Sequence, residues 1–188
     1  MRPRFLSSRL EFFSDAVMAV AITLMVLRIV PPREQPGETL GHAFVHDSIP
    51  AIIYFLISFA VIVSFWIEHH DIFERAPEKV SGTFLWVNTA LLATICLLPF
   101  GLEFFTANPT DYLTVGVYAG LMAIATLVLG ALARLADGHW SPIHFVQAGV
   151  FLLAIPLADV AGSGCLLVWV LVAPIQRIRF LRRTSPDH

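Results

Sequence analysis

Charged residues are scarce in this chain of 188 residues. Only 14% of the residues are charged, whereas 57% are hydrophobic and the mean hydropathy is +0.76. Soluble domains carry about 25% charged residues, so this composition excludes an ordinary soluble protein and indicates an integral membrane protein. The formal net charge of −2 gives no sign of a basic surface for nucleic acid.

Cysteine is also rare, with two residues in the whole chain. Cys96 and Cys165 both lie inside hydrophobic runs, where a disulfide framework has little purpose, and neither belongs to a spacing typical of a zinc site. We expect both cysteines to be packing residues, and we expect the protein to have neither a metal nor another cofactor.

Ionisable residues are absent from most of the hydrophobic runs. The segments 48–67, 83–102, 112–133 and 142–158 contain no Asp, Glu, Lys or Arg. Proton-coupled transporters and intramembrane enzymes place such groups near the middle of the membrane, because proton transfer and the activation of water require them. Their absence argues against both classes.

The chain does contain six apolar runs of roughly 17 to 22 residues, long enough at about 1.5 Å per residue to cross a hydrocarbon core of about 30 Å. They predict an all-α, polytopic membrane protein in which residues 1–188 form one six-helix domain. The first run is too long for a signal peptide and lacks a small-residue cleavage pattern, so we expect it to be retained. Between the first two runs, residues 36–47 are predicted to hold a short amphipathic helix. The runs lie near 12–30, 49–67, 84–102, 112–133, 143–160 and 162–180.

Basic residues are distributed unevenly between the connecting segments. If the N-terminus is cytoplasmic, only Arg28 and Arg33 lie outside, and both termini lie inside. The tail QRIRFLRR would then sit against anionic lipid headgroups. The other basic residues fall on the inner side: Arg2, Arg4, Arg9, Arg75, Lys79, Arg134, Arg177, Arg179, Arg182 and Arg183.

The first run opens with charges, in the segment RLEFFSDAVMAVAITLMVL from Arg9 to Leu27. Ser8 and Glu11 have the spacing of a capping box, so we predict that the helix starts at Arg9 and that Glu11 reaches back to the cap. Ser14 and Asp15 lie deeper, where an Asp costs about 2.5 to 3.5 kcal/mol on insertion scales. They therefore need partners on neighbouring helices or an aqueous vestibule.

A helical projection of this run separates a polar side from an apolar stripe. Ser14 and Asp15 point away from the stripe, whose only polar member after Phe13 is Thr23. Periodicity alone leaves this stripe as an ordinary lipid-facing or core-facing surface. Arg9 projects onto it too, at a vestibule mouth or bent towards a carboxylate. The stripe consists of Phe13, Ala16, Val17, Val20, Thr23, Leu24 and Leu27.

Polar residues of three runs gather at the predicted cytoplasmic side. They are expected to form a satisfied network, because each would otherwise be an unpaired group near lipid. Neighbouring His69 and His70, without a further His or Cys at ligand spacing, do not predict a zinc site. The residues are Arg9, Ser14 and Asp15 of the first run, Trp66, Glu68, His69, His70 and Asp71 of the second, and Asn88 of the third.

Three segments together resemble one known family. The pattern Arg9-x-x-x-Phe13-Ser14-Asp15, the segment WIEHHDIF from Trp66 to Phe73 and the segment WVNTALLATICLLPF from Trp86 to Phe100 are similar to the potassium channels of the transmembrane protein 175 family, whose animal member is lysosomal. The resemblance implies six-helix units with cytoplasmic termini, in which the first helix of each unit lines a central pore. The animal protein has two units per chain and forms dimers, so one unit per chain implies a prokaryotic homotetramer in the plasma membrane.

The resemblance also implies the site. The family's pore constriction falls on Val20, Leu24 and Leu27, with a ring of hydroxyl groups at Thr23, and potassium is the permeant ion. Relatives commonly have Ile where this chain has the smaller Val20. No TVGYG-like loop is present, so modest selectivity for potassium over sodium is expected.

The resemblance assigns packing and assembly, rather than ion binding, to the motif residues Arg9, Phe13, Ser14 and Asp15. Asp15 is expected to bond Trp66, His69 or His70, and Asn88 to join the network. Three alternatives to a channel stay open at this point. They are a secondary transporter of a small solute, a membrane enzyme acting through Glu68, His69, His70 and Asp71, and an assembly subunit without flux.

Overall fold

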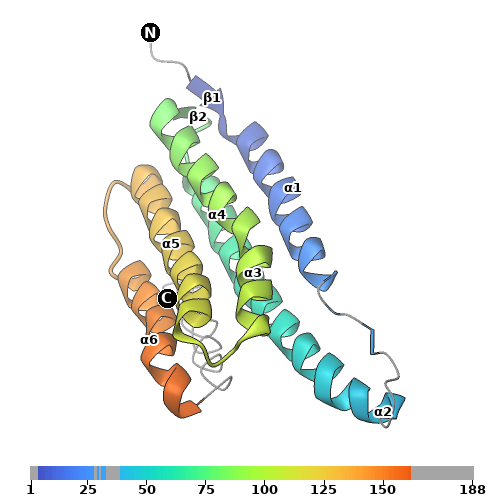
Figure 1. The fold of residues 1–188 in the computed structure, drawn as a ribbon. Helices are drawn as coiled ribbons and strands as arrows, with labels where there is room; N and C mark the ends of the chain where they lie inside the picture. The colour runs from blue at the N-terminus through green and yellow to red at the C-terminus, as the bar shows by residue number, and fades with distance from the viewer. Residues whose placement is uncertain (1–3, 28, 30, 33–38, 162–188) are drawn as a thin grey trace, which may run out of the picture.

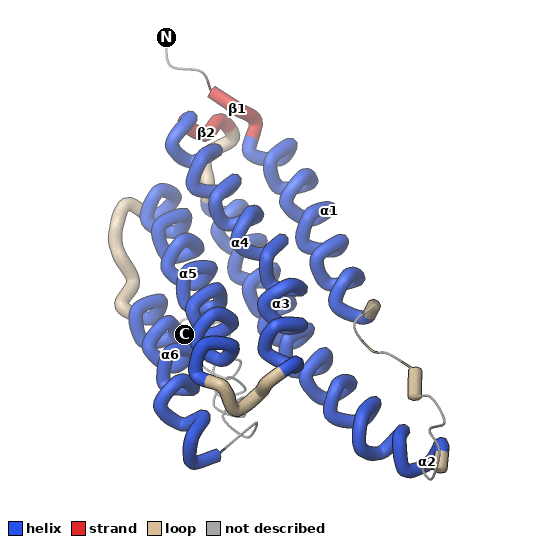
Figure 2. The backbone as a smooth tube through the Cα atoms, in the orientation of Figure 1, coloured by secondary structure: helices blue, strands red, loops and turns tan. Residues whose placement is uncertain are grey.

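The computed structural model of the chain describes residues 4–27, 29, 31–32 and 39–161. Within these residues the chain forms a bundle of long helices that run side by side, with a short strand pair at one end (Figures 1 and 2). The elements in chain order are β1 (Arg4–Leu6), α1 (Ser7–Val26), α2 (Leu40–Ala43), the π-helix η1 (Phe44–Ser48), α3 (Ile49–Arg75), β2 (Lys79–Ser81), α4 (Gly82–Ala107), α5 (Tyr112–Asp137) and α6 (Ile143–Ala161).

Length and composition qualify three helical segments of the described residues as membrane spans. They are Leu40–Arg75, Gly82–Ala107 and Tyr112–Asp137, and α6 contains the shorter apolar stretch Ile143–Leu157. Helix α1 has 20 residues but carries Arg9, Glu11 and Asp15. The predicted helical membrane fold is therefore confirmed. The sixth predicted run, 162–180, lies outside the described residues, and the number of spans, the side of the termini and the tetramer stay predictions.

Helix boundaries follow local capping chemistry. The side chain of Asp111 accepts hydrogen bonds from the first backbone N–H groups of α5 (2.8 and 3.2 Å), and that of Ser81 accepts one at the start of α4 (3.2 Å). Helix α3 ends at Arg75, beyond the predicted residue 67, because Ala76 precedes a proline and is extended (ψ 148°). The predicted helix within 36–47 exists from Leu40 and continues through η1 into α3.

The start of α1 corrects the predicted capping box. The helix begins at Ser7, its N-cap is Leu6, and no side chain caps it. Instead β1 pairs antiparallel with β2, and the N–H of Ser7 donates to the carbonyl of Glu78 (3.0 Å). This ladder satisfies the first backbone donor. Glu11, freed from the cap, bonds His70 on α3 (2.9 Å).

Packing within the bundle follows the chain order only from α4 to α6. Helix α1 lies against α3 and α4, α4 packs on α5, and α5 packs on α6 (Figure 1). Gly101 of α4 permits close approach to α5, since a Cβ atom there would lie 2.9 Å from the Tyr118 ring. The buried Tyr118 hydroxyl donates to Ser58 of α3 (2.7 Å). The core is therefore built from α3, α4, α5 and α6, and α1 adds Met18, Ala21 and Met25 at its edge.

Candidate functional site

Helix α1 has a covered face and an uncovered face. The covered face holds Ser14, Met18, Ala21 and Met25, which are buried against the bundle. Their spacing of four, three and four residues is that of one side of an α-helix. This face fixes the rotation of α1 about its axis, and therefore decides which residues point outward.

The predicted pore residues lie on the uncovered face. The exposed fraction is 56% for Val20, 45% for Leu24 and 72% for Leu27, and Thr23 and Phe13 are exposed as well. The hydroxyl of Thr23 donates to the carbonyl of Val20 one turn back (2.9 Å). That bond uses the hydroxyl proton, so the oxygen lone pairs of Thr23 remain available to a cation. The uncovered face is thus apolar with one oxygen donor.

A buried polar chain joins α1 to α4 and α3. The amide of Asn88 donates from Nδ2 to the hydroxyl of Ser14 (2.9 Å), which in turn donates to the carbonyl of Leu10 (2.7 Å). The Asn88 oxygen accepts from Nε2 of His69 (2.9 Å), so the imidazole carries a proton on Nε2. His69 Nδ1 is buried and has no hydrogen-bond partner in the described part of the chain. One amide therefore links three helices.

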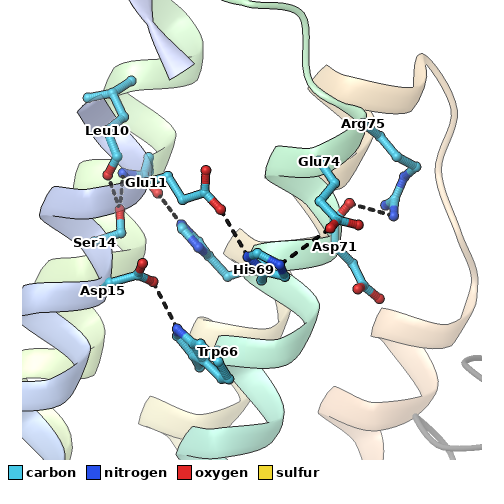
Figure 3. A network of polar contacts seen from close by, with 11 residues as sticks. Leu10, Glu11, Ser14, Asp15, Trp66, His69, Asp71, Glu74 and Arg75 are labelled. Carbon is cyan, nitrogen blue, oxygen red and sulfur yellow. Dashed lines mark hydrogen bonds and ion pairs between the residues drawn. The ribbon is translucent and has the colours of Figure 1, made fainter. Parts of the chain in front are cut away.

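A second, more exposed set of contacts lies beside the first (Figure 3). The indole N–H of Trp66 donates to Asp15 (2.8 Å), which is one of the partners predicted for this carboxylate. His70 bonds Glu11 of α1 through Nδ1 and lies 3.4 Å from Glu74 through Nε2. Both carboxylates at the start of α1 are thereby tied to α3.

Arg9 differs from the other motif residues. Its side chain is exposed, and it forms no ion pair with any carboxylate among the described residues. Arg9 was predicted to lie at a vestibule mouth or to bend towards a carboxylate. Within the described residues it does not contact a carboxylate. Within the motif, the Arg9 side chain is exposed, whereas Ser14 and Asp15 contact neighbouring helices.

A buried pair that was not predicted from the sequence joins Glu68 and His144. Nε2 of His144 on α6 lies 2.8 Å from a carboxylate oxygen of Glu68 on α3, and both side chains are almost fully covered. Gly130 of α5 makes room for the imidazole, since a Cβ atom there would lie 2.7 Å from the His144 ring. His144 lies in an apolar run without Asp, Glu, Lys or Arg, so the sequence pattern gives no sign of this contact.

An ion pair at the surface joins the C-terminal ends of α3 and α5. Arg75 of α3 donates from Nε and from an Nη atom to the two oxygens of Asp137 on α5 (2.9 and 3.2 Å). This bidentate geometry is the stronger form of such contacts. Within the described residues no group of three or more His, Cys, Asp or Glu side chains could hold a metal ion. The polar contacts at this end therefore join helices, whereas the stripe of α1 around Val20, Leu24 and Leu27 is exposed.

A family model and several known proteins match this chain. Residues 9–99 match the family model described as endosomal/lysosomal potassium channel TMEM175. A potassium channel of Chryseobacterium sp. is 34% identical over 72% of this chain and 69% of its own length. A potassium channel of Chamaesiphon minutus is 35% identical over 67% of this chain, and the match spans 64% of that relative.

Structural and animal relatives extend the comparison. The crystal structure of a lysosomal potassium-selective channel TMEM175 homolog from Chamaesiphon minutus has a TM-score of 0.71 and 27% identity, covering 95% of this chain and 98% of that one. The human endosomal/lysosomal proton channel TMEM175 is 23% identical over 74% of this chain, but only 26% of its own length is matched. The similarity thus includes the long helices that carry the candidate site.

Proposed function

The chain belongs to the TMEM175 family of ion channels, and from this membership we propose that it is a potassium-permeable channel that carries passive flux across a prokaryotic plasma membrane. The family is one of channels and not of enzymes. The chain is a multi-pass membrane protein, and its bacterial relatives are named potassium channels. A potassium pore is the function that these similarities support best.

One observation carries this proposal, the uncovered face of α1. Burial of Ser14, Met18 and Met25 turns Val20, Leu24 and Leu27 away from the bundle of their own chain. A helix at the edge of its bundle, with a face that the described residues leave uncovered, is suited to meet copies of itself around an axis. We therefore place the first helices of four copies around a central pore.

The chemistry of that face indicates how the pore handles ions. Rings of Val20, Leu24 and Leu27 would form a hydrophobic constriction that blocks ions when it is dry. Thr23 would contribute the only side-chain oxygens within this stretch. A ring of hydroxyl groups replaces only part of an ion's hydration shell, so we propose modest discrimination between potassium and sodium.

Replacing Thr23 with Ala is expected to lower the preference for potassium. The substitution removes all four hydroxyls of the proposed ring, and a loss of about 1.4 kcal/mol in the free-energy difference between the two ions lowers the permeability ratio of potassium to sodium about tenfold. The reversal potential of purified protein in planar bilayers under opposing potassium and sodium gradients measures this ratio. Thr89→Ala is the matched control, since the Thr89 hydroxyl also bonds its own helix (2.9 Å) but lies on α4.

The same recordings separate the channel from its rivals. Discrete single-channel current steps support a pore. A flux that saturates with substrate concentration and shows no current steps indicates a secondary transporter. Absence of any flux from correctly assembled protein indicates an assembly subunit. An unchanged permeability ratio in Thr23→Ala would exclude a role of Thr23 in selectivity. The channel proposal itself is tested by the wild-type currents.

Replacing Asp15 with Ala is expected to weaken assembly more than selectivity. The carboxylate accepts the Trp66 indole bond and so helps to set the position of α1 against α3. A contact at this partly exposed position is worth about 1 kcal/mol, or roughly fivefold for each chain, so the ratio of tetramer to smaller species should fall by about fivefold or more. Size-exclusion chromatography of the purified protein measures that ratio.

Two further variants make this test specific. Trp66→Phe keeps an aromatic ring but removes the indole donor, so it should reproduce the assembly defect. Glu74→Ala removes an exposed carboxylate of α3 that does not bond Trp66, and it should leave the elution profile unchanged. A defect in Glu74→Ala as large as that in Asp15→Ala would contradict a specific role of Asp15.

A further inference from the structure

A cation stacks on an aromatic ring beside the connection between α5 and α6. Arg134 belongs to the last turn of α5, and its guanidinium carbon lies 5.0 Å from the centroid of the Trp140 ring. Trp140 in turn contacts the ring of Phe145 in the first turn of α6, with the two centroids 5.7 Å apart. All three side chains, which we call the Arg134 cluster, are exposed. In Figure 1 this connection lies on the side of the bundle away from α1, so the cluster is separate from the proposed pore face.

The charge of Arg134 is not neutralised by a carboxylate of the described residues, none of which forms an ion pair with it. The carboxylate at the same helix end, Asp137, is bound by Arg75 in the bidentate pair. Stacking occupies the flat face of a guanidinium, whereas its five N–H donors lie in the plane of the group and point outward. The contact with Trp140 therefore orients a fork of donors and leaves it available to an anion.

The cluster lies where two apolar runs meet the polar connection. Residues 112–133 contain no Asp, Glu, Lys or Arg, and Arg134 is the next residue; the second such run, 142–158, starts just after Trp140. Tryptophan is enriched at this boundary, because its ring suits the headgroup level of the bilayer. The predicted topology puts the cluster on the cytoplasmic side, where anionic lipids attract basic residues.

An exposed apolar stripe continues from the cluster along α6. Phe145, Gly149 and Leu152 are exposed and are four and three residues apart, so they lie on one face of the helix. A Cβ atom at Gly149 would have no neighbour within 4 Å, so there is open space between the two larger side chains. An extended hydrocarbon chain fits such a stripe, whereas a small inorganic anion would make no use of it.

From these observations we propose that the Arg134 cluster binds one anionic phospholipid. The guanidinium of Arg134 donates to the lipid phosphate, since an arginine fork matches phosphate oxygens in a bidentate contact. Trp140 holds the guanidinium in position, and an acyl chain lies along α6 across Gly149. The headgroup is anionic rather than zwitterionic, because the cation of a zwitterionic headgroup would be repelled by Arg134.

Lipid titration of the delipidated full-length protein, followed by native mass spectrometry, tests the proposal. We expect phosphatidylglycerol to bind about fivefold or more tightly than phosphatidylcholine. Arg134→Gln should remove most of this preference. Trp140→Leu keeps the charge but removes the ring beneath it, so it should weaken phosphatidylglycerol binding about threefold. Inorganic phosphate in excess should not displace the lipid, because the acyl chain contributes to binding.

Lys79→Gln is the matched control, because it removes the same charge at another exposed position, on β2. Size-exclusion profiles like that of wild type establish that the variants are folded, as expected for exposed side chains. A preference for phosphatidylglycerol that persists in Arg134→Gln, or that falls equally in Lys79→Gln, overturns the proposal. Equal binding of the two lipids by the wild-type protein overturns it without any variant, and displacement by inorganic phosphate contradicts a lipid as the ligand.

Discussion

Replacing Leu27 with Asn is expected to produce a channel that conducts at rest. Leu27 is the most exposed of the three proposed constriction residues, with 72% of its surface uncovered. A ring of amides holds water where a ring of Leu side chains excludes it, so ions no longer meet a dry barrier. Lowering that barrier by about 1.4 kcal/mol or more raises the flux about tenfold or more. Macroscopic potassium current in proteoliposome-derived bilayers measures the change.

The neighbouring residue supplies the control for this experiment. Val26 is also exposed (46%), but it lies about 100° around the helix from Leu27. Val26→Asn adds the same polar group beside the proposed pore wall and should leave the current near the wild-type value. Equal currents for wild type and Leu27→Asn would exclude Leu27 from the constriction, and equal increases in both variants would assign the effect to general loosening of α1.

Replacing Glu68 with Leu is expected to cause the largest loss of stability. The substitution leaves the fully buried His144 imidazole without the carboxylate that it contacts at 2.8 Å. Removing the carboxylate leaves a buried polar group without its hydrogen-bond partner, which costs about 1 to 3 kcal/mol. For a chain of this size each kcal/mol corresponds to about 2 to 4 °C, so the melting temperature should fall by about 2 to 12 °C. Size-exclusion chromatography after heating measures the loss of folded protein.

Two comparisons distinguish the pair from either residue alone. His144→Phe keeps a ring in the space that Gly130 provides, and the double variant with Glu68→Leu should be less unstable than the sum of the single variants, by at least about 1 kcal/mol. Glu74→Leu, at a mostly exposed carboxylate of the same helix, should change stability by about 0.5 kcal/mol or less. Strictly additive effects would contradict a direct interaction between Glu68 and His144.

Periodicity was sufficient to predict the long helices and the two sides of α1. Apolar runs of membrane length leave few alternatives to a helix, because backbone groups must be satisfied internally in lipid. The face of Ser14 is indeed buried, and the face of Val20, Leu24 and Leu27 is indeed exposed. The partner of Asp15 was narrowed to three residues, of which the structure selects Trp66.

Contacts between residues far apart in the chain could not be predicted from periodicity. Strands β1 and β2 have three residues each and lie more than 70 residues apart in the chain, so neither has a pattern of its own. Because β1 pairs with β2, the start of α1 needs no capping box at Ser8, and Glu11 bonds His70 instead. The contact between Glu68 and His144 depends on the absence of a side chain at Gly130, which only the packing of α5 on α6 reveals.

The two ends of α1 are held by different kinds of contact. At the first end β1 is hydrogen-bonded to β2 and Ser7 to Glu78, whereas beyond Asp15 the helix is held by the apolar packing of Met18, Ala21 and Met25. Leu27 lies 21 residues beyond Leu6, or about 31 Å along the axis. A tilt of about 5° around the first end moves Leu27 by about 3 Å, close to the diameter of a water molecule. Val20, nearer the first end, moves less, so a rigid tilt of α1 would widen a pore from the end at Leu27 and leave the first end nearly still.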